Sequence, residues 1–418
     1  MTQASRAHAR QPSRRFREGH IAQHSCRIGT APFLDGVVVH DGRTGRLFQL
    51  NQTAAQVWRS LRDGANEEAI VGALARTHGL DPAALRGDLA AFVGAVRRAG
   101  LLGPDEAFAG GAAAELRPPR GTPALDAAYR VGGVVVRVTC YPAEIAAAFA
   151  PLAAPAMMPD GTSAQARLAL FRARGAFVLT CDDRWVERLD TAPAARWAMV
   201  RQLVSAARRR PWLALLHAGA IALPAGCLLL CGDSGAGKSS LLAGLVHAGF
   251  PFVADDIVPL EEGSGLVWPV RLAISIKNGS WAAIGSLFPE LAGAPIVRFG
   301  GRTMRYLWPD ARAVAVDSAG YPAAAVLFPR YVKDAPVTLT RLDAAQSLAL
   351  LGEGGSVLPT SDAGLAEFLV WWGRLPAYQL CYGRLEAAVA EVRALTDGPR
   401  ESRNGAASGA TAAIASEA

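Results

Sequence analysis

The sequence predicts a chain of two folded units, a small α+β unit at the front and a larger α/β unit behind it. Residues 33–50 alternate like a β-hairpin, and three helical segments follow them. Further along, an apolar strand runs directly into the sequence Gly232-Asp-Ser-Gly-Ala-Gly-Lys-Ser239, which is typical of a strand, loop and helix in succession. The stretch from Gly103 to Pro123 is rich in Ala, Gly and Pro, so we expect a flexible tether there.

The front unit is predicted to begin with a hairpin and to continue with three short helices. Apolar residues alternate over 33–39 and 47–50, on either side of a turn at 41–45. Helical patterns cover 51–61, 66–78 and 81–98. The capping residues are Asn51, Asn66 and Asp81 at the helix starts, Pro82 at a first helical position, and Gly79 and Gly100 at the ends. A hairpin with three small helices is a winged-helix-like arrangement.

Residues 130–210 are predicted to form a smaller α/β segment that leads into the core of the larger unit at 211–396. Strand-like runs lie near 134–138, 168–171 and 177–180, and helical runs lie near 143–149 and 194–209. No motif marks this segment. Residues 321–395 also alternate between strand-like and helical runs, with Trp371 and Trp372 expected in the core.

The segment Gly232–Ser239 is a complete G-x-x-x-x-G-K-S phosphate loop. Its three glycines allow the backbone to turn tightly and to point N–H groups at phosphate oxygens, while Lys238 reaches the β and γ phosphates and Ser239 binds Mg²⁺. A helix over 240–247, ended by Gly249, adds a favourable field for the phosphates. We therefore expect ATP and Mg²⁺ as cofactors. The expected nucleotide-binding residues are Gly232, Asp233, Ser234, Gly235, Ala236, Gly237, Lys238, Ser239 and Ser240.

Two adjacent acids follow the next predicted strand. The run 251–254 is short and apolar and ends at Asp255 and Asp256, where a neighbouring parallel strand would deliver a metal-binding carboxylate. Two adjacent carboxylates at a strand end repel each other, which is unfavourable unless a cation neutralises their charge. The alternative interpretation is a glycine-rich turn with an ordinary Asp-Asp pair on the surface.

The bulk composition fits folded domains in a reducing compartment. The chain has 418 residues, is 51% hydrophobic and carries a net charge of +7, which suits an anionic nucleotide and an acidic peptide but also follows from arginine content alone. The six cysteines form no C-x-x-C pair, and Cys227 and Cys231 would lie roughly 13 Å apart on one strand, too far for a disulfide. The apolar run 212–231 is interrupted by His217 and Pro224, so two buried strands are expected rather than a membrane span. Together with the lack of a secretory signal, these features predict a cytoplasmic protein.

The front unit resembles the PqqD-like peptide chaperones, also called precursor-peptide recognition elements, over residues 27–103. The resemblance rests on Leu50-Asn-Gln-Thr-Ala-Ala-Gln-Val-Trp58, the Asp63-Gly64 turn, the helix start Glu67-Glu68-Ala-Ile70 and the closing Gly100-Leu-Leu102. It implies that the unit holds the leader segment of a ribosomally made peptide as an added strand.

A winged-helix nucleic-acid binder is the competing interpretation of the front unit. It would draw on the arginines of the basic tail at 1–26, but these lack interleaved aromatic residues and are typical of a solvated arm, so nucleic acid is not expected as a partner. The tail at 397–418 is rich in Gly, Ala and Ser and is expected to be disordered. Residues 104–129 are expected to link the two units.

The run from His217 to Asp256 resembles the catalytic core of HPr kinase/phosphorylase and its relatives, with weaker similarity over about 130–395. The resemblance implies that the strand histidine, the phosphate loop with Lys238 and the two acids converge on the transferred phosphate. His217 would orient or stabilise the phosphoryl group. Asp255 would be the general base and Asp256 a metal ligand beside Ser239, although the roles of the two acids could be reversed.

The sequence departs from that family after the acidic pair. Enzymes that also remove phosphate carry a Glu-Ile-Arg-Gly-type segment, whereas this chain reads Trp268-Pro-Val-Arg-Leu-Ala-Ile-Ser-Ile-Lys-Asn-Gly279. The difference argues against phosphorylase activity and against HPr as the substrate. Cations that could neutralise phosphoryl charge are Arg271, Lys277, Arg298, Arg302 and Arg305.

The preferred hypothesis is a two-domain kinase in which the front unit captures a precursor peptide and the larger unit phosphorylates a hydroxyl on it, expected to be a serine. A nucleotide-gated peptide carrier without phosphotransfer and a small-metabolite kinase are the two alternatives. HPr-type kinases often form rings, so a homo-oligomer stays open, but the sequence shows no self-association surface.

Overall fold

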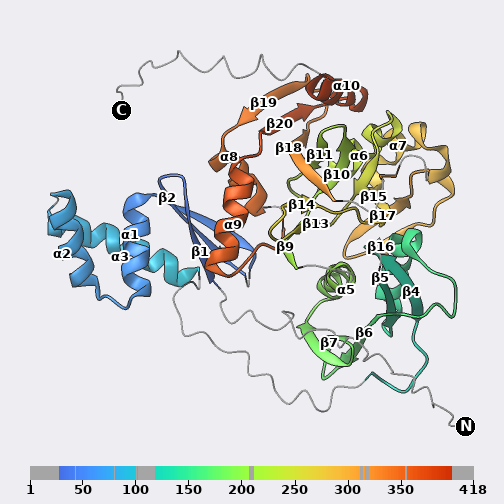
Figure 1. Ribbon diagram of the computed structural model, residues 1–418, viewed down its shortest axis with the longest axis horizontal. Helices are drawn as coiled ribbons and strands as arrows, with labels where there is room; N and C mark the ends of the chain where they lie inside the picture. The colour runs from blue at the N-terminus through green and yellow to red at the C-terminus, as the bar shows by residue number, and fades with distance from the viewer. Residues whose placement is uncertain are drawn as a thin grey trace, which may run out of the picture.

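The computed structural model describes residues 28–42, 44–79, 81–99, 101, 118–132, 134–206, 211–310, 314–315, 320–353 and 355–397 (Figure 1). The predicted basic tail at 1–26, the tail from 398 to 418 and residues 102–117 of the expected tether lie outside these ranges. Cys26, Gly100 and Leu102 lie outside them too.

The front unit is a three-stranded antiparallel sheet followed by three helices. Its strands are β1 (Ile28–Phe33), β2 (Gly36–Asp41) and β3 (Arg46–Leu50), paired in that order. Its helices are α1 (Gln52–Arg62), α2 (Glu67–His78) and α3 (Pro82–Arg98). Each predicted cap accepts a backbone N–H, and Gly79 ends α2 with a left-handed φ of 66°. Strand β1 extends the predicted hairpin into a sheet.

The two faces of this sheet pack against different parts of the chain. One face, with Val37 and Val39, forms a buried cluster with Trp58 of α1 and Val96 of α3. The opposite face contributes Ala31 and Val38 to the main core of the larger unit. The front sheet is therefore buried on both sides, which explains why β2 is apolar at successive positions.

A five-stranded sheet forms the segment that leads into the core. It contains β4 (Leu125–Val131), β5 (Val134–Cys140), β6 (Ala166–Ala173), β7 (Ala176–Cys181) and β8 (Arg184–Leu189) in that order. Only β5 and β6 run parallel, and α4 (Ala143–Ala153) connects them. Helix α5 (Ala192–Ala206) follows. Strand β4 begins at Leu125, inside the range 104–129 that we expected to be linker, so the folded unit begins earlier than predicted.

The largest sheet has nine strands and carries the phosphate loop. Its strands are β9 (Trp212–Leu216), β10 (Gly219–Leu223), β11 (Gly226–Leu230), β12 (Phe252–Ala254), β13 (Val258–Glu261), β14 (Leu266–Val267), β18 (Tyr321–Tyr331), β19 (Thr338–Leu342) and β20 (Ala377–Tyr382). The apolar run 212–231 forms three strands instead of the expected two, because the chain turns at 217–218 and again at 224–225. No helix in the described ranges is long and apolar enough to cross a membrane.

Helices and a small third sheet complete the larger unit. A three-stranded sheet contains β15 (Ile274–Lys277), β16 (Val297–Phe299) and β17 (Arg302–Leu307). The helices are α6 (Lys238–His247), α7 (Trp281–Leu287), α8 (Ala344–Glu353), α9 (Asp362–Gly373) and α10 (Leu385–Asp397), with 3-10 turns at Ala154–Ala156, Asn278–Ser280 and Pro289–Gly293.

Strand direction brings four strand ends to one edge of the large sheet. Strands β11, β18 and β20 are parallel to one another, and β12 runs the same way because β10 is antiparallel to both β11 and β12. The loops after these strands therefore share one side of the sheet, which is where ligands bind in open α/β sheets.

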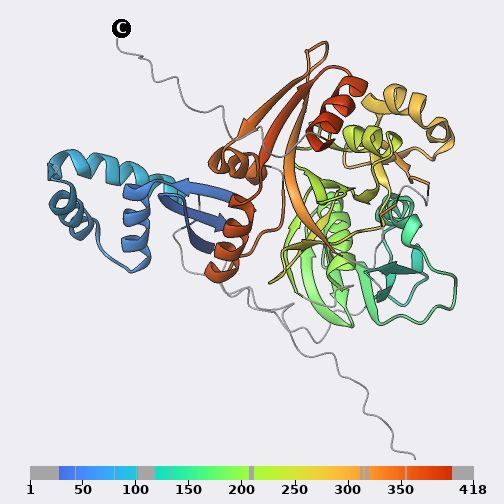
Figure 2. The same ribbon diagram turned by 45° about the horizontal axis from the view of Figure 1, so that its top comes forward.

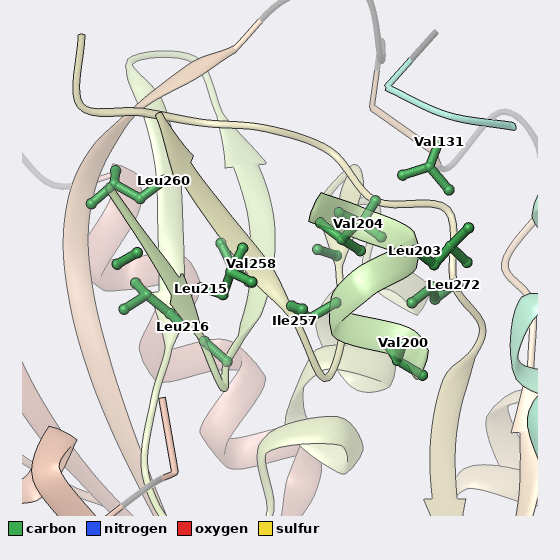
Figure 3. Packing of buried hydrophobic residues seen from close by; sticks show 14 of the residues in the cluster. Val131, Val200, Leu203, Val204, Leu215, Leu216, Ile257, Val258, Leu260 and Leu272 are labelled. Atoms are coloured by element: carbon green, nitrogen blue, oxygen red, sulfur yellow. The ribbon is translucent and has the colours of Figure 1, made fainter. Parts of the chain in front are cut away.

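The main core joins the lead-in segment to the large sheet. Val200 and Leu203 of α5 belong to the same buried cluster as Leu215 of β9 and Val258 of β13 (Figure 3). Leu203 is completely buried, so its burial contributes about 2 kcal/mol to stability. Packing of α5 thus fixes the lead-in segment against the strands that carry the candidate site.

The front sheet is docked on α9 and on the segment before it (Figure 2). The Thr30 amide donates to Asp362 Oδ1 at 2.8 Å, and His40 Nδ1 lies 2.8 Å from the Pro359 carbonyl oxygen, so the ring donates there. Gln49 Nε2 donates to the Ala345 carbonyl at 3.0 Å. We expected only a tether between the units, but direct contacts join them.

Candidate active site at the phosphate loop

Residues 232–239, the phosphate loop, connect β11 to α6 in a conformation that requires glycine. Gly232, Gly235 and Gly237 have φ values of 120°, 102° and 100°. L-amino acids with side chains rarely adopt these values, since the Cβ atom would clash with the backbone. At Gly237 a Cβ atom would also lie 2.5 Å from the Tyr382 hydroxyl oxygen. The loop therefore has the shape of an anion-binding turn at the start of a helix.

Lys238 is buried inside the turn that the loop makes. Its Nζ donates to the carbonyl oxygens of Gly232 at 2.6 Å and of Asp233 at 3.0 Å. Burial lowers its pKa, and the carboxylates of Asp255 and Asp256 oppose that effect. The loop carbonyls thus hold the ammonium group at the turn whose amides would receive phosphates.

Asp255 contacts the serine that follows the lysine. Ser239 Oγ lies 3.2 Å from Oδ1 and 3.0 Å from Oδ2 of Asp255, and the Ser275 amide donates to Oδ2 at 3.1 Å. Only 1% of Asp255 is exposed. Burial, and to a smaller extent the neighbouring charge of Asp256, raise the pKa of its carboxyl group to about 7, although the hydrogen bonds from Ser275 and Ser239 and the charge of Lys238 act in the opposite direction. A hydroxyl and a carboxylate in contact at this position form the usual protein half of a magnesium site in phosphate-loop enzymes.

Asp256 has an unusual backbone that His217 holds in place. Its φ is 65°, a left-handed value for a residue with a side chain. His217 Nδ1 lies 3.1 Å from the Asp256 carbonyl oxygen, which can only accept, so Nδ1 carries the proton. Burial lowers the pKa of His217 more than nearby Asp256 raises it, which favours the neutral ring. His217 lies in the turn between β9 and β10 and not in a strand as the resemblance implied, and from this turn it positions the second acid.

His217 is also tied to two distant parts of the chain. Its amide donates to Ser356 Oγ at 3.0 Å, and the neighbouring Leu215 exchanges two backbone hydrogen bonds with Val357. The Trp197 ring of α5 packs edge-on against the imidazole, with ring centroids 5.9 Å apart. Neither Ser356 nor Trp197 was predicted from the sequence.

The predicted cations separate into one that reaches the phosphate loop and others with different surroundings. Lys277 Nζ donates to Ser234 Oγ at 2.8 Å, and burial together with the charge of Arg302 lowers its pKa. Arg305 instead lies over the Trp281 ring at 4.6 Å and donates to the Leu291 carbonyl. The three others, Arg271, Arg298 and Arg302, are exposed.

The residues at the loop fit Mg²⁺ only if phosphate oxygens complete its shell. Ser239 and Asp255 offer hard oxygen ligands, which Mg²⁺ prefers, and Mg²⁺ in nucleotide sites usually takes one or two carboxylates together with phosphates and water. Within the described ranges no three His, Cys, Asp or Glu side chains are grouped to hold a metal by themselves. The donor set thus suits a cation that arrives with a nucleotide.

Within the described residues, the front sheet has one edge that the chain covers and one edge without a strand neighbour. Asp362 caps the β1 edge, and a Cβ atom on Gly29 of β1 would lie 3.1 Å from the Thr360 backbone. Strand β3 pairs only with β2 among the strands in the described part of the chain. An added strand could therefore pair with β3 but not with β1.

Comparison with known proteins identifies part of the chain. Residues 36–102 match the family model for coenzyme PQQ synthesis protein D (PqqD). These residues form a PqqD domain. The match runs from β2 to the end of the front unit, which confirms the resemblance that we drew for 27–103. No curated protein gives a match to the chain. The PqqD match ends at residue 102, and the unit behind it is a mixed α/β structure in which the likeness to HPr kinase stays a prediction.

Proposed function

We propose that the chain is an ATP-dependent kinase that phosphorylates a hydroxyl group, most simply that of a serine, on a ribosomally made precursor peptide held by its PqqD domain. The observation that carries the proposal is the contact between Ser239 and Asp255 beside the buried Lys238. This is the arrangement that phosphoryl-transfer enzymes use to hold a nucleotide and its metal.

Peptide capture is supported by the front unit. A PqqD domain suggests binding of a ribosomally made precursor peptide. An extended peptide can add to a sheet edge through main-chain hydrogen bonds, and β3 offers such an edge. Because the front sheet contacts α9 directly, a peptide on β3 would have a defined position relative to the phosphate loop.

The geometry favours the reversed roles for the two acids, with Asp255 on the metal side and Asp256 as the base. Asp255 is buried against Ser239, whereas Asp256 is only partly buried and is positioned by His217. Bound Mg²⁺ would neutralise charge on the β and γ phosphates. Lys238 and the loop amides would bind the same phosphates. Asp256 would accept the proton of the acceptor hydroxyl while the hydroxyl oxygen of the peptide forms a bond to the γ-phosphorus. The bond between the γ-phosphorus and the β–γ bridging oxygen would break at the same time, which releases ADP.

Labelled ATP tests this proposal. The protein is incubated with ATP labelled at the γ-phosphate and with candidate precursor peptides encoded beside its gene. Transfer of label to peptide is expected, and Asp256→Asn should reduce the rate roughly 10²- to 10⁴-fold without loss of ATP binding, the usual cost of removing a general base. Label on a small molecule, or none on any acceptor while ATP binds, would contradict the peptide-kinase assignment.

One observation favours a second candidate, a nucleotide-gated peptide carrier. The segment from Ser356 to Asp362 contacts His217 at one end and β1 at the other. Nucleotide binding near His217 could therefore change the affinity of the front sheet for a peptide without any transfer. Peptide affinity that depends on Mg-ATP, with no label on the peptide, would support this candidate over the kinase.

A further inference from the structure

Tyr331 is an exposed aromatic residue fixed beside the phosphate loop. It ends β18, and 53% of its surface is exposed. Its amide donates to the Ala236 carbonyl of the loop at 3.1 Å. A Cβ atom on Gly237 would lie 3.4 Å from the Tyr331 side chain, so the tyrosine is in van der Waals range of the turn. No sequence motif accounts for an aromatic side chain at this place.

Contacts from β20 hold the ring in position. The rings of Tyr331 and Tyr382 meet edge-on, with centroids 5.7 Å apart and planes at 67°. Tyr382 is itself buried and its hydroxyl donates to the Gly237 carbonyl at 3.3 Å. The Val332 amide donates to the Tyr382 carbonyl at 2.9 Å. The exposed ring is thus preorganised. The backbone of Tyr331 is hydrogen-bonded to the loop, and the ring that packs against it, Tyr382, is hydrogen-bonded to the loop as well.

The turn after β18 is shaped to lie against the end of β20. Asp334 in this turn has a left-handed φ of 61°. A Cβ atom on Gly383 would lie 2.6 Å from the Ala335 nitrogen, so only glycine allows the turn to approach the end of β20 this closely. The two strand ends and the turn therefore form one continuous surface next to the phosphate loop.

This surface is on the side of the sheet where the remainder of a nucleotide would extend. Strands β11, β18 and β20 are parallel, and Asp255 follows β12 on the other side of β11. Metal and acceptor groups would occupy the side with the acids. The ribose and base must leave the loop elsewhere, and the ends of β18 and β20 lie in the opposite direction along the sheet.

We infer that the purine base of the bound nucleotide stacks on Tyr331, in a subsite formed by the ends of β18 and β20 and the turn 332–335. The inference rests on the proposed function, since it assumes that the loop holds a nucleotide. Aromatic side chains stack on the π-face of any base, and the exposed ring of Tyr331 lies beside the loop that would hold the phosphates.

Binding measurements with one ligand that carries a purine base and one that lacks it test the inference. Mg-ATP and Mg-tripolyphosphate, which has the phosphates but no base, are titrated into the full-length protein and its variants. Tyr331→Ala should weaken Mg-ATP about 5- to 100-fold, the contribution expected from stacking one base, and leave Mg-tripolyphosphate unchanged. Tyr331→Phe should retain the affinity of the wild type. Met157→Ala, which removes an exposed apolar side chain elsewhere, should change neither ligand.

The outcomes separate this inference from the proposed function. If wild-type protein binds Mg-ATP and Tyr331→Ala binds it equally well, the base does not stack there. If Tyr331→Ala weakens both ligands equally, the tyrosine only supports the loop, and the inference is also wrong. If Tyr331→Ala lowers affinity for the precursor peptide and not for ATP, the surface is a peptide contact. If the wild type binds neither phosphate ligand, the nucleotide assignment itself fails.

Discussion

Replacing Asp255 with asparagine should change how the stability of the nucleotide-free protein depends on pH. Burial, and to a smaller extent the charge of Asp256, raise the pKa of this carboxyl to about 7, so the folded state keeps its proton over a pH range in which the unfolded state has lost it. The folded state then binds more protons, and the unfolding free energy of the wild type falls as the pH rises towards 7. Asparagine cannot ionise, so the unfolding free energy of the variant does not fall with pH for this reason.

The size of the effect follows from the pH interval. Between pH 5 and pH 7 the wild type loses about 1.4 kcal/mol per pH unit from this group, or about 3 kcal/mol in all, and above pH 7 the loss ends. Relative to wild type, Asp255→Asn should therefore gain about 3 kcal/mol in unfolding free energy between pH 5 and pH 8. Urea unfolding of the full chain, in a chelator and without nucleotide, measures the difference at each pH.

Two controls identify the cause. Asp233→Asn removes an exposed carboxylate of the same loop, and its unfolding free energy should depend on pH as that of the wild type does, between pH 5 and pH 8. Asp256→Asn removes the second contribution to the raised pKa and should flatten the pH dependence only in part, because burial is the larger cause. If the difference in unfolding free energy between Asp255→Asn and the wild type is the same at pH 5 and pH 8, the pKa of the buried carboxyl is not raised in the folded state.

Three further predictions concern the loop, the core and the docked front sheet. Gly237→Ala should abolish Mg-ATP binding in calorimetry, because its φ of 100° and the Tyr382 hydroxyl leave no room for Cβ, whereas Gly263→Ala, with φ 79° and open space, should bind normally. Leu203→Ala should lower the unfolding free energy by about 2–5 kcal/mol in urea titrations, and a loss below 1 kcal/mol would contradict its place in the core. Asp362→Ala should speed hydrogen exchange at the Thr30 amide while exchange in α3 stays unchanged, and equal exchange in both proteins would show that the contact does not protect β1.

The features that sequence could predict are those that depend on a short stretch of chain. Asn51, Asn66 and Asp81 cap helices because each bonds an amide two or three residues ahead, so the signal is local. The phosphate loop is local for the same reason, since its glycines, lysine and serine are contiguous. The order of β11, the loop and α6 followed directly from that pattern.

The features that sequence missed depend on contacts between distant segments. Ser356 reaches His217 across 139 positions, and Tyr331 reaches the loop only because β18 pairs with β11 in parallel. Nothing near either residue in the chain marks it. Docking of β1 on α9 likewise depends on the tertiary packing of a helix far along the chain, so a tether was the simplest expectation from composition. The contact of Asp255 with Ser239 also bears on which acid we propose as the metal ligand and which as the base, a choice that the spacing of the two residues alone could not decide.

Calorimetric titration of Mg-ATP into the full-length protein tests the central claim most directly, namely that the phosphate loop and the paired acids together grip a nucleotide and its cation. We expect saturable binding at one site per chain that weakens strongly when Mg²⁺ is chelated and when Ser239 is replaced by alanine. Absence of binding heat with the wild type, or binding that is indifferent to both Mg²⁺ and Ser239→Ala, would contradict it.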